Sequence, residues 1–152
     1  MPLLAVMLEK LHSALQTDRI LSNRLLELVR LRIAFWNQCR ACMAARELPT
    51  LADGLTEKLV CSLERPQEAQ DLTRAERVAI AYADLMATDH LSIDDETYDA
   101  LRECFTEEEI TELAINVAWW VGFGRLAATL NLYDNDDFQV TGQRVTAWSH
   151  MS

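Results

Sequence analysis

ELVRLRIAFWNQCRACMAAR, residues 27–46, joins an amphipathic helix to a short break and then to two cysteines spaced two residues apart. Apolar residues recur at helical spacing over residues 21–33, which predicts one buried helix face. Glu27 lies near the edge of that stripe, and Asp18 is the expected N-cap of the helix. The stretch therefore predicts a helix that leads directly into a pair of reactive side chains.

The break is expected at Asn37 and Gln38, which are weak helix formers, so that Cys39 and Cys42 open a new helix ending near Glu47. Residues at i and i+3 share one helix face, and two such thiols can close a disulfide with modest backbone adjustment. At a helix N-terminus, unpaired backbone N–H groups and the helix dipole both lower a thiol pKa. Because thiolate attacks peroxides and disulfides, this spacing indicates redox chemistry.

Two arginines lie close to the cysteine pair in sequence, Arg40 beside Cys39 and Arg46 one turn beyond Cys42. Either cation would favour thiolate. A structural zinc site usually requires four ligands, and none of the remaining cysteines and histidines is paired at ligand spacing, so no metal is expected. Cys61 and Cys104 are interpreted as small buried apolar residues.

The rest of the chain predicts further helices and no convincing strand. Capping boxes are expected at Thr73–Glu76 and at Thr106–Glu109. Residues 110–132 form one long expected helix that is apolar on nearly all sides and is therefore predicted to be the buried central helix. The expected fold class is all-α with about six or seven helices, and residues 139–152 form a polar tail.

Composition limits the possible partners and compartment. The 152 residues are 50% apolar, contain few Gly and Pro, and suit a single all-helical domain, residues 1–152. The formal net charge of -10 argues against nucleic acid and against an anionic membrane surface, and no apolar run is long enough to span a bilayer. The N-terminus lacks the pattern of a signal peptide, so the expected compartment is the cytoplasm, where a close cysteine pair favours redox function over a structural disulfide.

Glu27 followed twelve residues later by CRAC resembles the carboxymuconolactone decarboxylase superfamily, on its alkylhydroperoxidase-D-like branch. The resemblance extends to LTRAERVAIAYADLMATDH, residues 72–90, and to EEEITELAINVAWWVGFGRL, residues 107–126. It implies an all-helical bundle that assembles as a homotrimer or homohexamer. It also implies that Cys42 attacks a hydroperoxide, that Cys39 resolves it as a disulfide, and that Glu27 relays protons.

The sequence departs from the family pattern beside the cysteines. Arg46 stands where the family has a relay histidine, and Ala41 stands where it often has His or Tyr. Arginine cannot act as a base, but Arg46 could stabilise thiolate or bind an anionic substrate. From its spacing alone, Glu27 would be solvated or paired with Arg30 or Arg24; the resemblance favours the relay role instead. Trp119, Trp120 and Phe123 are expected in the core or at a subunit interface, with a lining role beside the cysteines as the alternative.

The leading hypothesis is a thiol-dependent peroxidase, antioxidant or disulfide oxidoreductase that needs no cofactor. Its expected partners are a small hydroperoxide or disulfide and a protein electron donor that the sequence does not identify. One alternative is a non-redox enzyme similar to carboxymuconolactone decarboxylase, which would not need the cysteine pair. The other is a helical oligomer that senses redox state without turnover. The reason for this alternative is that Arg46 stands where the family has its relay histidine.

Overall fold

The structure is a computed structural model that describes residues 2–46 and 48–130. These residues form eight α-helices and two short 3-10 helices, with no β-strand among them. The elements are α1 (Pro2–Thr17), α2 (Asn23–Trp36), α3 (Arg40–Ala44), α4 (Leu48–Ala52), α5 (Glu57–Cys61), η1 (Ser62–Glu64), α6 (Arg74–Thr88), η2 (His90–Ser92), α7 (Asp95–Arg102) and α8 (Glu107–Thr129). The all-α fold class is confirmed, and the additional helices are short. The expected tail, residues 139–152, lies outside the described residues.

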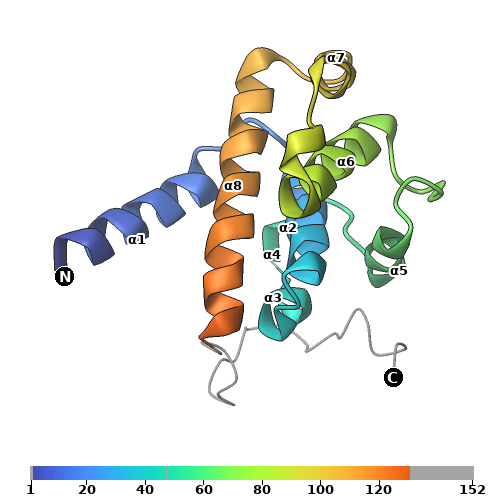
Figure 1. Ribbon diagram of the computed structural model, residues 1–152. Helices are drawn as coiled ribbons and strands as arrows, with labels where there is room; N and C mark the ends of the chain where they lie inside the picture. The colour runs from blue at the N-terminus through green and yellow to red at the C-terminus, as the bar shows by residue number, and fades with distance from the viewer. Residues whose placement is uncertain (1, 47, 131–152) are drawn as a thin grey trace.

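Helix α2 is the centre of the bundle, and it packs against both α6 and α8 (Figure 1). Nine of its fourteen residues are buried, so the apolar stripe predicted for residues 21–33 is real but broader than one face. The core side chains that are fully buried include Leu26, Leu28, Val29, Leu31, Ile33, Leu63, Ile80, Leu101, Leu113 and Val117. The cysteine segment follows directly from this rigid helix.

The prediction that the long C-terminal helix is the buried central one is wrong for the single chain. Only five residues of α8 are buried, and Ile115 and Leu126 are each 49% exposed. Helix α8 instead lies along one side of α2, with one face in the core and another open (Figure 1). A sequence that is apolar on all sides does not reveal which face meets the chain's own core.

Local capping explains where several helices begin. Both expected capping boxes are present, with Thr73 and Glu76 exchanging side-chain and backbone hydrogen bonds at the start of α6. Burial acts to raise the pKa of Glu76, but hydrogen bonds from Arg24 and from the Thr73 backbone outweigh it and hold that pKa below its ordinary value. The expected N-cap of α2 at Asp18 is wrong, because Ser22 accepts the hydrogen bond from the Leu25 N–H.

Helix α1 projects from the bundle beside α8 (Figure 1). None of its residues, all of which are described, is buried, and Leu3 and Leu4 are 70% and 59% exposed. Its connection to α2 is fixed by Glu112 of α8, whose carboxylate accepts hydrogen bonds from the backbone N–H groups of Ile20 and Leu21 at 3.0 and 2.9 Å. Within residues 2–46 and 48–130, a helix with the length and apolarity needed to cross a bilayer is not found.

Candidate active site

Cys39 and Cys42 form a disulfide with an S–S distance of 2.08 Å. The expected break separates them from α2: Asn37 is the C-cap, and Gln38 adopts a left-handed backbone conformation with φ of 52°. Glycine is the usual residue at such a helix end, and a residue with a side chain costs about 1–2 kcal/mol there. Helix α3 then begins behind Cys39 as predicted, but it ends at Ala44 instead of near Glu47.

Cys39 is the N-cap of α3, and its sulfur accepts a hydrogen bond from the Cys42 N–H at 3.3 Å. This is the interaction expected of a cysteine at the start of a helix. Because α3 has only five residues, its dipole is small, and the direct N–H···S contact is the larger local effect. The arrangement stabilises negative charge on the sulfur of Cys39 when the disulfide opens.

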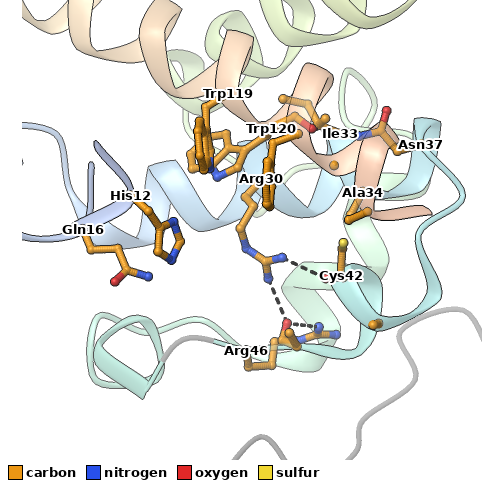
Figure 2. A pocket seen from close by; sticks show the side chains of 15 residues that line it. His12, Gln16, Arg30, Ile33, Ala34, Asn37, Cys42, Arg46, Trp119 and Trp120 are labelled. Carbon is orange, nitrogen blue, oxygen red and sulfur yellow. Dashed lines mark hydrogen bonds between the residues drawn. The ribbon is translucent and has the colours of Figure 1, made fainter. Parts of the chain in front are cut away.

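The two sulfurs differ in access. Cys39 is 3% exposed, whereas Cys42 is half-buried and lines a cavity of about 390 Å³ between α1, α3 and α8. Figure 2 shows the Cys42 sulfur at one side of this cavity, with Trp119 and Trp120 of α8 facing it from above. A reactant that enters the cavity therefore meets Cys42 first.

Asn37, at the break between α2 and α3, is hydrogen-bonded to α8. Its side-chain amide donates to the Trp120 carbonyl at 2.9 Å, and its amide oxygen accepts from Arg125 at 3.2 Å. A Cβ on Gly124 would lie 2.6 Å from the Asn37 nitrogen, so the glycine permits this close approach of a side chain. Gly122, by contrast, has open space where a Cβ would lie.

Glu27 is not near the edge of the stripe as predicted: it is 2% exposed and lies inside the bundle. Both of its carboxylate oxygens accept hydrogen bonds from Arg30, at 2.6 and 2.7 Å. The same guanidinium donates to the carbonyls of Cys42 and Ala45, each at 2.8 Å (Figure 2). Arg30 thus connects the buried glutamate of α2 to the backbone of the cysteine helix, and the relay role of Glu27 stays a prediction.

Arg46 is 8% exposed and lines the cavity, but its guanidinium is committed to structural contacts. It pairs with both oxygens of Glu57 at 3.0 and 3.1 Å and donates to the carbonyls of Met43 and Ala45. The charge of Arg46 is therefore compensated by a carboxylate from α5. Its role in stabilising thiolate or binding an anion stays a prediction.

The opposite wall of the cavity includes residues that the sequence did not mark as functional. His12 and Gln16 reach it from α1 (Figure 2). His12 is exposed, and it stacks on Trp119 with 5.9 Å between ring centroids. Arg30 was expected only as a possible partner of Glu27, and that pair is present. Its hydrogen bonds to the cysteine helix were not predicted.

The other two cysteines correct a prediction. Cys61 is exposed and Cys104 is half-buried, and both thiols are free, so neither is the small core residue that was expected. Cys61 ends the short helix α5 and faces solvent because only Leu59 and Val60 of that helix are buried. In the part of the chain that the structure describes, no group of three His, Cys, Asp or Glu side chains is placed to hold a metal ion.

Comparisons with known proteins place this geometry among related folds. No family model matches the chain. Two uncharacterized proteins of Mycobacterium tuberculosis, from strains CDC 1551 / Oshkosh and ATCC 25618 / H37Rv, are each 33% identical to it over 93 residues. That match covers 60% of this chain and only 32% of each relative, so the chain spans about a third of their length.

Two solved structures share the fold over 86% of this chain at 22% sequence identity. One is ATU0492 from Agrobacterium tumefaciens, a protein of unknown function that is assigned provisionally to the AhpD antioxidant defence proteins, with a TM-score of 0.75 and 90% of that chain covered. The other is the debrominase Bmp8 in its apo form, with a TM-score of 0.73 and 70% covered. The expectation of an alkylhydroperoxidase-D-like helical fold is confirmed, and the chain carries its Cys39–Cys42 pair as a disulfide on that fold.

Proposed function

We propose that the protein is a thiol-dependent peroxidase or disulfide oxidoreductase that uses Cys39 and Cys42 as its redox pair. The single observation that carries this proposal is a disulfide with one sulfur in a cavity and the other buried behind it. A structural disulfide three residues apart would close too short a loop to stabilise the fold by much. The AhpD-like fold supports the same assignment.

In the oxidative half of the cycle, the Cys42 thiolate attacks the outer oxygen of a hydroperoxide. The O–O bond breaks, the alkoxide takes up a proton to leave as an alcohol, and Cys42 becomes a sulfenic acid. Cys39 then attacks the Cys42 sulfur, which forms the disulfide and releases water. One hydroperoxide and two thiols yield one alcohol, one water and one disulfide.

In the reductive half, a dithiol on an electron-donor protein attacks the accessible sulfur, Cys42. The Cys39–Cys42 bond breaks and Cys39 leaves as thiolate, which the Cys42 N–H is placed to stabilise. The second donor thiol resolves the mixed disulfide, and protons from the donor restore both thiols. The difference in burial thus gives the two cysteines complementary roles in both halves.

Glu27 and Arg30 have a different part in this proposal. A proton relay requires a carboxylate oxygen that can give and accept a proton, and both oxygens of Glu27 accept from the Arg30 guanidinium. We therefore propose that the main role of Glu27 is to be the counterion that keeps Arg30 hydrogen-bonded to the carbonyls of Cys42 and Ala45. Arg30 is a positioning residue for the cysteine helix.

The test is stopped-flow oxidation of the reduced protein by an organic hydroperoxide, with free thiols counted afterwards. We expect loss of two thiols per chain, and loss of the fast phase in a Cys42→Ser variant. Cys61→Ser is the matched control, because Cys61 is an exposed free thiol away from the cavity, and it should oxidise at the wild-type rate. Equal rates in wild type and Cys42→Ser would refute the proposal.

Further assays separate the alternatives. A non-redox enzyme of the decarboxylase type would keep its activity on a carboxylated lactone after both cysteines are changed to serine. A redox sensor would form the disulfide slowly, change its assembly state and show no turnover with a dithiol reductant. Turnover that depends on Cys42 excludes both.

We also propose that the chain works as a homotrimer or homohexamer. The support is the apolar stripe of α1, which includes Leu4, Met7 and Leu11 and which its own bundle does not bury. Such a surface is typical of a contact between subunits. Size-exclusion chromatography with light scattering tests this, and a monomer at micromolar concentration would refute it. A Leu4→Glu, Leu11→Glu double variant should lower the assembly state.

A further inference from the structure

The cavity beside Cys42 has a row of stacked aromatic rings along one wall. Trp119 and Phe123 lie 4.7 Å apart between ring centroids with an angle of only 6° between their planes, and His12 continues the row at 5.9 Å and 30° from Trp119. All three rings line the same cavity as Cys42, and Figure 2 shows His12 and Trp119 among them. Because Trp119 lies between His12 and Phe123 in this row, a further ring meets the row at its ring edges, in the edge-to-face contact that aromatic pairs favour.

The cationic groups of the cavity do not make it an anion site. The charge of Arg30 is compensated by Glu27 and that of Arg46 by Glu57, each through two hydrogen bonds. Much of the remaining wall is apolar, with Ile33 on the side of α2. An uncharged substrate loses less hydration here than an anion, which would find both guanidinium groups already engaged.

The size of the cavity also selects the class of substrate. Its volume of about 390 Å³ lies within the range of pockets that hold small organic molecules, and it is far larger than hydrogen peroxide requires. A small oxidant would leave the aromatic wall in contact with water alone. A substrate with a ring can cover that wall while its reactive group reaches Cys42.

We propose, on the basis of the proposed function, that the preferred oxidants are uncharged organic hydroperoxides with an aromatic ring on the carbon that bears the –OOH group. The ring packs against the edges of Trp119 and Phe123, and the outer peroxide oxygen meets the Cys42 sulfur. The Cys42 thiolate takes that oxygen, the O–O bond breaks, and the aromatic alkoxide is protonated and leaves as the alcohol. Cys39 then closes the disulfide with release of water, and a dithiol reductant restores the pair.

Cumene hydroperoxide and tert-butyl hydroperoxide form a matched pair of probes, because they differ only in a phenyl group where the other has a methyl. The measured quantity is the ratio of their second-order rate constants with reduced protein, divided by the same ratio for free N-acetylcysteine. We expect a corrected ratio of at least about 10 in the wild-type protein, the lower end of what one extra apolar group gives in an enzyme pocket. Phe123→Leu and Trp119→Leu should each reduce it at least about threefold.

Leu126→Ala is the control for these variants, since Leu126 is a half-exposed apolar residue of the same helix that is not in the cavity lining. It should leave both rate constants and their ratio unchanged. The ratio is independent of the fraction of active protein, so partial misfolding of a variant does not affect it. A wild-type ratio near 1, or a high ratio that neither aromatic substitution changes, would overturn the proposal. Cys42-dependent oxidation with a flat ratio would refute only the substrate class, while absence of oxidation by either probe would refute the proposed peroxidase activity itself.

Discussion

Replacing Arg30 by methionine should destabilise the protein more than the loss of any surface ion pair. The substitution removes the guanidinium that pairs with Glu27 at 2.6 and 2.7 Å and that supports the carbonyls of Cys42 and Ala45 at 2.8 Å. Methionine is also unbranched and apolar, so it can fill the space of the arginine stem. The perturbation therefore isolates the charge and the hydrogen bonds.

The magnitude follows from burial. The side chains of Glu27 and Arg30 are 1% and 13% exposed, so the variant removes two hydrogen bonds and a positive charge from a buried carboxylate. Removing one member of a buried pair costs about 3–5 kcal/mol in free energy of unfolding. Two carbonyls also lose a charged donor, at about 1 kcal/mol each, although these losses are not additive. We expect a total loss of about 3–5 kcal/mol.

Equilibrium unfolding of the oxidised protein in urea measures this loss, at one protein concentration and with the disulfide intact. Arg102→Met is the control, because Arg102 pairs with Glu107 at the surface with side chains 52% and 76% exposed, and it should leave the free energy of unfolding almost unchanged. The double variant Glu27→Leu, Arg30→Met replaces both charges with apolar groups. It should recover at least about 2 kcal/mol relative to Arg30→Met alone.

Two results would refute the reasoning. A loss below about 1 kcal/mol for Arg30→Met would show that the pair contributes no more than a surface contact. Equal or greater destabilisation of the double variant would show that the lost contact between Arg30 and the buried Glu27 carboxylate is not the source of the cost. Either outcome would remove the basis for treating Arg30 as the residue that positions the cysteine helix.

Three further predictions concern groups outside the cysteine pair. Burial raises the pKa of Tyr82 to about 12, so its absorbance near 295 nm should titrate only at a pH close to that at which the protein unfolds. The free energy of unfolding should fall as the pH rises from about 10 through 12. The folded-state pKa of Glu76 is lowered, so its contribution to stability is present above the unfolded value near 4.5 and is lost as the pH falls through the folded value. Glu76→Gln should therefore make the stability depend less on pH in acid unfolding monitored by circular dichroism. Gly124→Ala should destabilise by up to about 2 kcal/mol in thermal unfolding, because its Cβ would meet the hydrogen-bonded amide of Asn37 at 2.6 Å at a packing cost of about 1–3 kcal/mol, and the better helix propensity of alanine offsets about 1 kcal/mol of that cost. Gly122→Ala, with open space, should be neutral or stabilising by up to about 1 kcal/mol.

Local interactions were predictable from the sequence. The capping boxes that begin at Thr73 and Thr106 involve residues three apart, and both are present. The break before Cys39 was also predictable, because Asn37 and Gln38 are poor helix residues and no long-range contact is needed to stop the helix. The same locality explains why the disulfide between the cysteines was expected.

Long-range contacts explain what the sequence did not reveal. Helix α2 begins five residues after Asp18, with Ser22 as its cap, and the carboxylate of Glu112, more than ninety residues away, holds the connection between α1 and α2. Glu27 is buried because Arg30 folds over it to reach the cysteine helix, a contact that helical spacing alone does not indicate. His12 joins the cavity wall because α1 lies beside α8, which depends on the arrangement of whole helices.

The division of roles between the two sulfurs is tested most directly by trapping sulfenic acid. Single Cys39→Ser and Cys42→Ser variants are treated with an organic hydroperoxide in the presence of dimedone, and the adduct is located by peptide mass spectrometry. We expect a dimedone adduct on Cys42 in the Cys39→Ser variant and at most a slow trace on Cys39 in the Cys42→Ser variant, because only Cys42 faces the cavity. Adducts that form at equal rates on both cysteines, or no adduct on Cys42, would contradict the account.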